Sequence, residues 1–359
     1  MNYLLAFLVA LIITAAITPF VRRLALKYKI LDEPGRDERK IHKKPTPLLG
    51  GLAVFIGALA TILIYWFGSD YLHLGNLEPK QILGLVLGMS ALLIGGIIDD
   101  MFDLRPWQQI IWPILATLIL IGAGIGITEI TNPFGGIIRL DEWERVLFWL
   151  NGTAYKITLP ADIITFGWML LMIYTTKFLD GLDGLAAGIT GIGAFMIFAL
   201  AMFTQFYQPD VAMLAIIVAG VMAGFLVWNF NPAKIFLGEA GSTICGFLLG
   251  ALAIIAGSKI ATALLVMAVP VLDLIWVVIR RIFYEKRSPF KGDKKHFHFR
   301  LLELGLGQRQ AVLFLYLIAF AFGTATLFLQ SRYKLLTLGV LVIVMMTMGL
   351  ILVNKYRRV

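Results

Sequence analysis

The sequence has little charge, few histidines and almost no cysteine. Only 15% of its 359 residues are charged, four are histidine and one, Cys245, is cysteine. A single cysteine excludes an intrachain disulfide. The scarcity of charge, with 59% hydrophobic residues and a mean hydropathy of +0.86, excludes an ordinary soluble domain. No basic segment precedes the first apolar run, so we expect an uncleaved first helix rather than a removed signal peptide.

The apolar residues gather in blocks of about 20 residues, the length that crosses a bilayer as a helix. Backbone groups in lipid must pair within their own segment, so each block should be helical. The sequence therefore predicts an all-α polytopic membrane protein with a single integral-membrane domain over residues 1–359. Eleven transmembrane spans are predicted: 2–21, 48–68, 81–98, 107–127, 159–176, 185–204, 212–231, 241–257, 260–281, 310–328 and 335–353.

Basic residues are unevenly distributed over the loops between these spans. If the loop after the first span is cytoplasmic and the loops alternate, 24 of the 31 Lys and Arg residues fall on the cytoplasmic side. The positive-inside rule expects this bias, which predicts an outside N-terminus and a cytoplasmic C-terminus. The same alternation puts the short acidic loops on the cytoplasmic side, where their carboxylates can meet in one inner-leaflet cleft.

Two acidic motifs lie in those loops. In IIDDMFDL, Asp99 and Asp100 point about 100° apart on a helix end and can serve two roles, and Asp103 shares a face with both. A polar stop at a span end would need only one of these acids. In FLDGLDGLAAG, Asp180 and Asp183 are three residues apart, and the glycines let a ligand come close. A flexible turn is the alternative, but a turn does not need the repeated DGxDG.

Two weaker motifs precede the second and eighth spans. In NPAKIFLGEAGST, the free amides and the hydroxyl from Gly238 to Ser242 suit phosphate oxygens at a helix start. Glu239 either stabilises that helix through its dipole or ligates a cation. In HKKPTPLLGG, Lys43 and Lys44 lie in a stiff proline-rich hinge and can meet an anion.

The basic loop 280–310 contains His296, His298 and Arg300 at alternating positions. Alternation would put all three on one face of an extended segment, and we favour contact with a ligand over an anchor to lipid headgroups. The absence of a nearby cysteine or third histidine disfavours zinc. Asp273 lies about two turns inside the ninth span, where a carboxylate is costly, so a functional or paired role is expected. Pro270 should bend or break that helix.

The chain resembles the polyprenyl-phosphate N-acetylhexosamine-1-phosphate transferase family, which includes MraY, WecA and TagO. The resemblance covers nearly the whole chain and rests on motifs in matching order and spacing: KPTPLLGG, IIDDMFDL, FLDGLDGLAAG, NPAKIFLGEAGS, VPVLD and RSPFKGDKKHFHFRLL. The last loop looks more like the WecA/TagO branch, which uses UDP-GlcNAc. The alternative is an MraY-type enzyme, which uses UDP-MurNAc-pentapeptide.

The resemblance implies a reaction in which GlcNAc-1-phosphate passes from UDP-GlcNAc to undecaprenyl or another polyprenyl phosphate. UMP leaves, and the lipid-linked sugar diphosphate initiates a cell-envelope polysaccharide such as lipopolysaccharide or teichoic acid. Charge neutralisation in such a reaction calls for Mg²⁺, with Mn²⁺ as a substitute, held by hard oxygen ligands. The resemblance also implies the bacterial inner membrane, a cytoplasmic site, contact with membrane lipid but no nucleic acid, and a homodimer.

The resemblance assigns roles to residues by position. Asp99 is expected to orient or deprotonate the lipid phosphate, and Asp100 to be catalytic and to help hold the metal. Asp180 and Glu239 match metal ligands. Contacts with the substrates are expected from the remaining candidates: Lys44, Lys177, Asp183, Ser242, Asp273, His296, His298 and Arg300.

Three positions depart from the family pattern. Lys177 stands where the family usually has Asn, Glu239 where it has Asp, and Phe299 where it has His. Glutamate is one methylene longer than aspartate, so a bound Mg²⁺ or the backbone must shift to keep octahedral geometry. These departures leave an inactive or re-purposed homologue as an alternative.

The predicted outside loop, residues 128–158, has a strand-like pattern. GGIIRL (135–140) and YKITLP (155–160) are predicted to pair as a short hairpin, with DEWERVLFWL between them as an amphipathic segment on the membrane. A secondary transporter is a rival class for the whole chain. Transporters carry charges near mid-membrane in repeated halves, whereas here only Asp273 is clearly intramembrane and no half-length repeat is visible. A lipid-binding scaffold derived from an inactive transferase is a third hypothesis.

Overall fold

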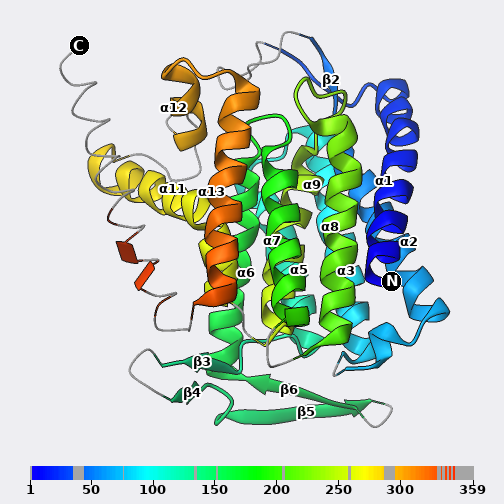
Figure 1. Ribbon diagram of the computed structural model, residues 1–359, viewed down its shortest axis with the longest axis vertical. Coiled ribbons are helices and arrows are strands. Elements are labelled where there is room, and N and C mark those ends of the chain that lie inside the picture. Colours follow the sequence, from blue (N-terminus) through cyan, green and yellow to red (C-terminus); the bar gives the residue numbers. More distant parts are fainter. Residues whose placement is uncertain are drawn as a thin grey trace.

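The protein is an assembly of roughly parallel helices with small β-hairpins at one end (Figure 1). This computed structural model describes residues 2–34, 44–75, 77–132, 136–150, 153–203, 207–257, 260–286 and 296–329, with a few single positions up to 343. Most of the last predicted span, 335–353, lies outside the described residues.

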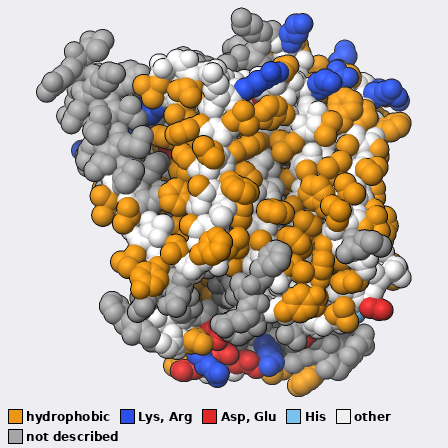
Figure 2. Space-filling model, in the orientation of Figure 1, with side chains coloured by type: hydrophobic (Ala, Val, Ile, Leu, Met, Phe, Trp, Pro, Cys, Tyr) orange, Lys and Arg blue, Asp and Glu red, His pale blue; other side chains and the backbone are white. Residues whose placement is uncertain are grey.

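Eight helices of the described chain are long and apolar enough to cross a membrane. Figure 2 shows the apolar side chains that cover the sides of these helices, as expected for a surface in contact with lipid. Their bounds agree with eight predicted spans to within a few residues: α1 Asn2–Lys27, α2 Gly50–Gly68, α3 Pro79–Phe102, α6 Leu159–Leu179, α7 Leu185–Phe203, α8 Pro209–Asn229, α9 Gly238–Ile255 and α13 Gln308–Phe328.

Two other predicted spans are interrupted. The ninth consists of α10 (Ile260–Val266) and α11 (Ala268–Ile279), which meet at an angle of 80°, the geometry of a broken span or a re-entrant loop. Pro270 lies in the first turn of α11, so the predicted break is confirmed. The fourth is α4 (Pro106–Gln109) followed by α5 (Ile111–Gly122), a shorter apolar unit than the predicted 107–127. The described residues therefore confirm the fold class but not the count of eleven spans.

Helix α9 is the central helix, and its first turn is held by close packing. Gly51 at the start of α2 and Gly96 near the end of α3 lie directly against Ala240. A side chain at either glycine would collide with the backbone around Ala240, so the small residues allow three helices to meet. This contact fixes the position of Glu239, the second residue of α9.

The strands lie at the two ends of the helices (Figure 1). At one end, which we call the hairpin end, β3 (Glu129–Thr131) pairs with β4 (Ile137–Arg139) and β5 (Glu144–Leu150) pairs with β6 (Thr153–Thr158). At the other, the acid end, β1 (Leu31–Asp32) pairs with β2 (Thr46–Pro47).

The predicted pairing at the hairpin end is wrong. The segment 137–139 pairs with 129–131, not with 155–160, and the DEWERVLFWL segment contributes a strand rather than an intervening amphipathic segment. Strand β5 pairs with the next strand in the chain, with Leu150 opposite Thr153, and such local pairing costs less loop-closure entropy than the predicted long connection.

The basic loop before α13 also differs from its prediction. Residues 296–300 are not extended, because α12 (Phe297–Glu303) begins directly after His296. A short π-helix, Arg280–Tyr284, continues α11 on the other side of the loop. A 3₁₀ turn, Tyr71–His73, follows α2 at the hairpin end.

Candidate active site

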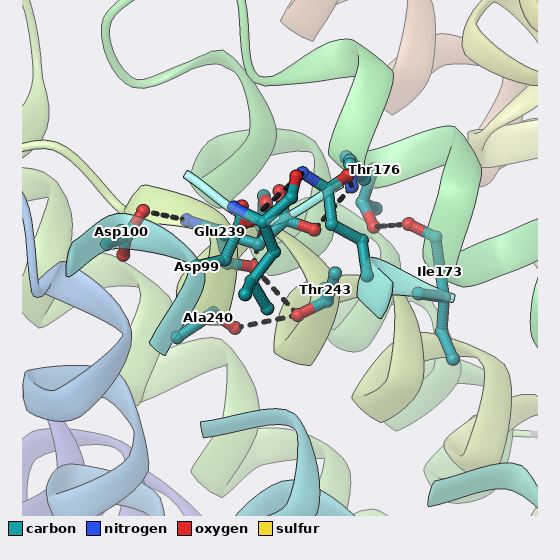
Figure 3. Close-up of polar contacts among 11 residues, drawn as sticks. Asp99, Asp100, Ile173, Thr176, Glu239, Ala240 and Thr243 are labelled. Carbon is teal, nitrogen blue, oxygen red and sulfur yellow. Dashed lines mark hydrogen bonds and ion pairs between the residues drawn. The ribbon is translucent and has the colours of Figure 1, made fainter. Parts of the chain in front are cut away.

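Carboxylates from three separate connections meet at the acid end. Asp99 and Asp100 lie in the last turn of α3, Asp180 directly follows α6, and Glu239 lies in the first turn of α9. Figure 3 shows Asp99, Asp100 and Glu239 close together between these helices. The acids of the three loops therefore lie together at the acid end, as predicted.

Asp100 is bound to the start of α9. Its Oδ1 accepts a hydrogen bond from the Glu239 amide at 3.0 Å (Figure 3), whereas its Oδ2 is buried without a described partner. Gly238 makes this approach possible, because its φ of +70° and its missing side chain leave room for the Asp100 carboxylate. A buried carboxylate oxygen without a partner is costly unless a ligand or cation meets it.

A chain of polar contacts links Asp99 to Glu239. The Gln109 amide nitrogen donates to Asp99 Oδ1 at 2.9 Å and to the Leu104 carbonyl at 3.0 Å. The Gln109 side-chain oxygen accepts from Lys177 Nζ at 3.0 Å, and Lys177 Nζ forms an ion pair with Glu239 Oε1 at 2.5 Å. Gln109 thus connects two predicted site residues, although it was not itself predicted. A glutamine at the end of a four-residue helix gives no signal in the sequence.

Asp180 lies in a strongly negative environment. Burial, together with the carboxylates of Glu239, Asp183 and Asp32, raises the pKa of its carboxyl to about 8. Asp32 is a second residue that sequence reasoning missed. It is brought near the site by the pairing of β1 with β2, a contact between segments that no local pattern reveals.

Two predicted substrate contacts are used within the protein. Asp183 Oδ2 accepts hydrogen bonds from the Asn231 side chain at 2.8 Å and from the Ala233 amide at 3.0 Å, which hold the loop before α9. The buried Ser242 hydroxyl donates to the Glu239 carbonyl at 3.1 Å. Both residues shape the site, and direct contact of either with a substrate stays a prediction.

Asp273 organises the histidines on the other side of Asp180. Its Oδ2 lies 2.7 Å from His296 Nδ1, and its Oδ1 accepts from the Phe297 amide at 2.9 Å. This pairing confirms the prediction that an intramembrane carboxylate would be partnered. It also explains why α12 begins at this point, because the carboxylate holds one of its first free amides.

His298 is buried beside His296, and the centroids of the two rings are 5.7 Å apart. The pKa of His298 is lowered to about 4, mainly by burial; Asp273 opposes this shift and His296 contributes to it. The Nε2 atom of His298 has no described hydrogen-bond partner and lies against Gly181, where a side chain would collide with it. The glycine of the DGxDG motif therefore admits the imidazole.

Two apolar cavities end at these polar groups. One lies between α7, α13 and the bend of α10 and α11, and has Asp273 and His298 at its polar end. The other is walled by Trp112 and Leu92 and reaches Asp99 and Glu239. Both are small, with free volumes of about 20 Å³ and 10 Å³, which is room for about one water molecule.

Two further candidates are placed by their backbone elements. Lys44 is exposed just before β2, and Arg300 is half-buried in α12. The segment after Lys44 is nevertheless anchored to the site, because the Gly51 amide donates to the Leu237 carbonyl at 2.8 Å. The roles of Lys44 and Arg300 stay predictions.

The described residues do not contain three His, Cys, Asp or Glu side chains in an arrangement that could hold a metal ion. Their chemistry does fit a hard divalent cation, because Asp100, Asp180 and Glu239 offer carboxylate oxygens and Asp100 Oδ2 is buried without a described partner. The ion pair of Glu239 with Lys177 occupies one of these carboxylates.

Helices of membrane-spanning length with partly buried carboxylates at one end define the chain as an integral-membrane protein with an enzyme-like polar site. Residues 82–257 match glycosyl transferase family 4. The chain belongs to this family, as its motifs predicted.

Curated relatives cover most of the chain. It is 30% identical over 303 residues to a probable undecaprenyl-phosphate N-acetylglucosaminyl 1-phosphate transferase of Bacillus subtilis. That alignment covers 83% of this chain and 76% of the relative. A decaprenyl-phosphate N-acetylglucosaminephosphotransferase of Mycolicibacterium smegmatis is 33% identical, in an alignment that covers 82% of this chain and 74% of the relative. A phospho-N-acetylmuramoyl-pentapeptide-transferase of Halalkalibacterium halodurans is 29% identical, covering 84% and 88%.

Proposed function

We propose that the protein transfers N-acetylglucosamine-1-phosphate from UDP-GlcNAc to a polyprenyl phosphate and releases UMP. The observation that carries the proposal is the meeting of Asp99, Asp100 and Glu239 at one end of the helices, next to an apolar cavity. The two relatives named as N-acetylglucosamine phosphotransferases support the same donor. The names of these relatives favour this donor over the MraY-type alternative.

In the proposed reaction, an oxygen of the lipid phosphate attacks the β-phosphorus of UDP-GlcNAc. The bond from that phosphorus to the bridging oxygen breaks, and UMP leaves with the electron pair. Asp99 lies where it can orient the attacking phosphate, since Gln109 and the Leu104 amide fix one of its oxygens. A phosphate monoester is largely ionised near neutral pH, so orientation is a larger task for Asp99 than proton removal.

Asp100, Asp180 and Glu239 are the residues that would hold Mg²⁺. The ion would neutralise charge on the diphosphate and on the departing UMP. These carboxylates come from three different helix ends, so the packing of α3, α6 and α9 sets their spacing. Mn²⁺ is the expected substitute, because it accepts the same oxygen ligands.

The remaining candidates are proposed to bind the substrates. His296 and His298 are held beside Asp180 by Asp273 and Gly181, which suits contact with the sugar diphosphate. Four residues complete the proposed set: Lys44, Asp183, Ser242 and Arg300.

We place the acid end in the cytoplasm of a bacterial cell, with the chain in the inner membrane and the N-terminus outside. Lys and Arg side chains gather at the acid end in Figure 2, as the positive-inside rule expects of a cytoplasmic face. UDP-sugars are cytoplasmic, so the substrate and the acids would lie on the same side. Dimerisation remains an expectation of the family resemblance.

The test is an assay of UMP release by purified protein with polyprenyl phosphate, Mg²⁺ and a panel of UDP-sugars. We expect turnover with UDP-GlcNAc, a fall to background in EDTA and recovery on adding Mg²⁺. UDP-MurNAc-pentapeptide as the sole donor would instead assign the MraY-type reaction. Undiminished turnover in EDTA would show that the reaction does not need the proposed metal.

A further inference from the structure

We infer that Lys177 is a tethered counter-ion that occupies Glu239 until a divalent cation displaces it. This inference deepens the proposed function and rests on it, because Glu239 is there a metal ligand. The contact that carries it is the 2.5 Å ion pair between Lys177 Nζ and Glu239 Oε1.

The ion pair is sheltered from solvent. The Lys177 and Glu239 side chains are 18% and 17% exposed, so water and salt screen their attraction weakly. The ammonium is held in place by a second bond, to Gln109 Oε1 at 3.0 Å. Lys177 is therefore a built part of the site rather than a mobile surface charge.

The backbone places the ammonium among the acids. Lys177 is in the last turn of α6, three residues before Asp180, so the two side chains lie on neighbouring parts of one helix face. Glu239 approaches from the first turn of α9. One positive charge thus enters a group of carboxylates that repel each other, and it offsets part of that repulsion when no metal is bound.

A cation cannot use Glu239 Oε1 while Lys177 holds it. Binding of a divalent ion to Glu239 must therefore include the loss of the ion pair. Removing the lysine should tighten metal binding by about tenfold to a hundredfold, the equivalent of one charge-assisted hydrogen bond. Once displaced, the ammonium is free to meet a phosphate oxygen of the substrate.

Displacement of Lys177 also reaches Asp99. Gln109 accepts from Lys177 with its oxygen and donates to Asp99 with its nitrogen, so one rigid amide joins the two. When Lys177 leaves, Gln109 loses one of the three hydrogen bonds that fix the direction of its amide. Metal binding at Glu239 and the orientation of Asp99 are coupled through this single side chain.

The experiment measures Mn²⁺ affinity directly, without substrate. Free Mn²⁺ is followed by electron paramagnetic resonance as it is titrated into wild-type protein, K177N and K177M in detergent. We expect both variants to bind Mn²⁺ at least tenfold more tightly than the wild type. The matched control is K156N, because Lys156 forms an ion pair of the same length with Glu144 at the hairpin end, and its removal should leave Mn²⁺ affinity unchanged.

Unchanged or weaker Mn²⁺ binding in the folded Lys177 variants would overturn the inference. If neither variant folds, Gln109→Ala decides, because it removes one of the two bonds that hold Lys177. Tighter Mn²⁺ binding in Gln109→Ala supports the inference and unchanged binding overturns it. UMP release is assayed separately on the wild type, so tighter Mn²⁺ binding without any UMP release would reject the proposed function and keep Lys177 as the counter-ion.

Discussion

Two lysine–glutamate pairs at opposite ends of the molecule have the same length and different surroundings. Lys177–Glu239 at the acid end and Lys156–Glu144 at the hairpin end are both 2.5 Å long. The first pair is under 20% exposed, whereas the side chains of the second are 45% and 39% exposed, beside a polar pocket of about 640 Å³. Distance alone does not identify a functional charge. Burial and the neighbouring acids set the two pairs apart.

The strongest test of this comparison is the Asp99→Asn variant. It should lower UMP release by about 10²–10⁴-fold, because the amide loses the charge that orients the lipid phosphate. Steady-state assays in detergent would measure the loss, with folding checked by thermal unfolding. Activity within a few-fold of wild type would show that the acid end is not where the chemistry occurs.

The next effect is expected from Asp273→Asn. The change removes the negative partner of His296 and weakens the bond to the Phe297 amide. Loss of a charge-assisted hydrogen bond costs about 1.5–3 kcal/mol, so we expect kcat/KM for UDP-GlcNAc to fall about tenfold or more. Kinetic assays over a range of donor concentrations measure this ratio. An unaltered kcat/KM would mean that the histidines need no anchor.

Buried His298 predicts sensitivity of the acid end to low pH. Its pKa is lowered from 6.5 to about 4, so between these values the unfolded chain binds a proton that the folded protein does not. The folded state should therefore lose stability as pH falls from about 6.5 towards 4, by up to about 3 kcal/mol. His298→Gln should remove this loss, as measured by denaturation at several pH values. The same pH dependence in His298→Gln would rule out His298 as its source.

The smallest effect is expected at the hairpin end. Lys156→Met removes an exposed ion pair and should change stability by less than about 1 kcal/mol. UMP release should stay within about twofold of wild type. Chemical denaturation and the UMP assay measure the two quantities. A large loss of activity would give the hairpins a role that nothing in their contacts indicates.

The spans and the meeting of the acids were predictable, because hydropathy and charge bias depend on composition over long windows. Eight spans and the break before Pro270 follow from these signals. Because successive loops alternate between the two sides of the membrane, the loops with Asp99, Asp180 and Glu239 were expected at one end. The packing of α9 against Gly51 and Gly96 brings the first and the last of these loops into contact.

The errors arise where distant segments decide local structure. The histidine motif alternates as a strand would, but Asp273 holds the Phe297 amide and starts a helix there. Short strands at the hairpin end have several compatible partners, and alternation alone does not choose among them. Gln109 was missed for the same reason, since its importance comes from two residues on other helices.

The glycine contacts at the first turn of α9 have a mechanical consequence. With no side chain at Gly51 or Gly96, α2, α3 and α9 touch backbone to backbone and form one unyielding block. Asp100 and Glu239 therefore stay at a fixed separation while other parts of the protein adjust. Any movement that admits or releases a substrate must come from the segments outside that block, among them α12 and the end of α6.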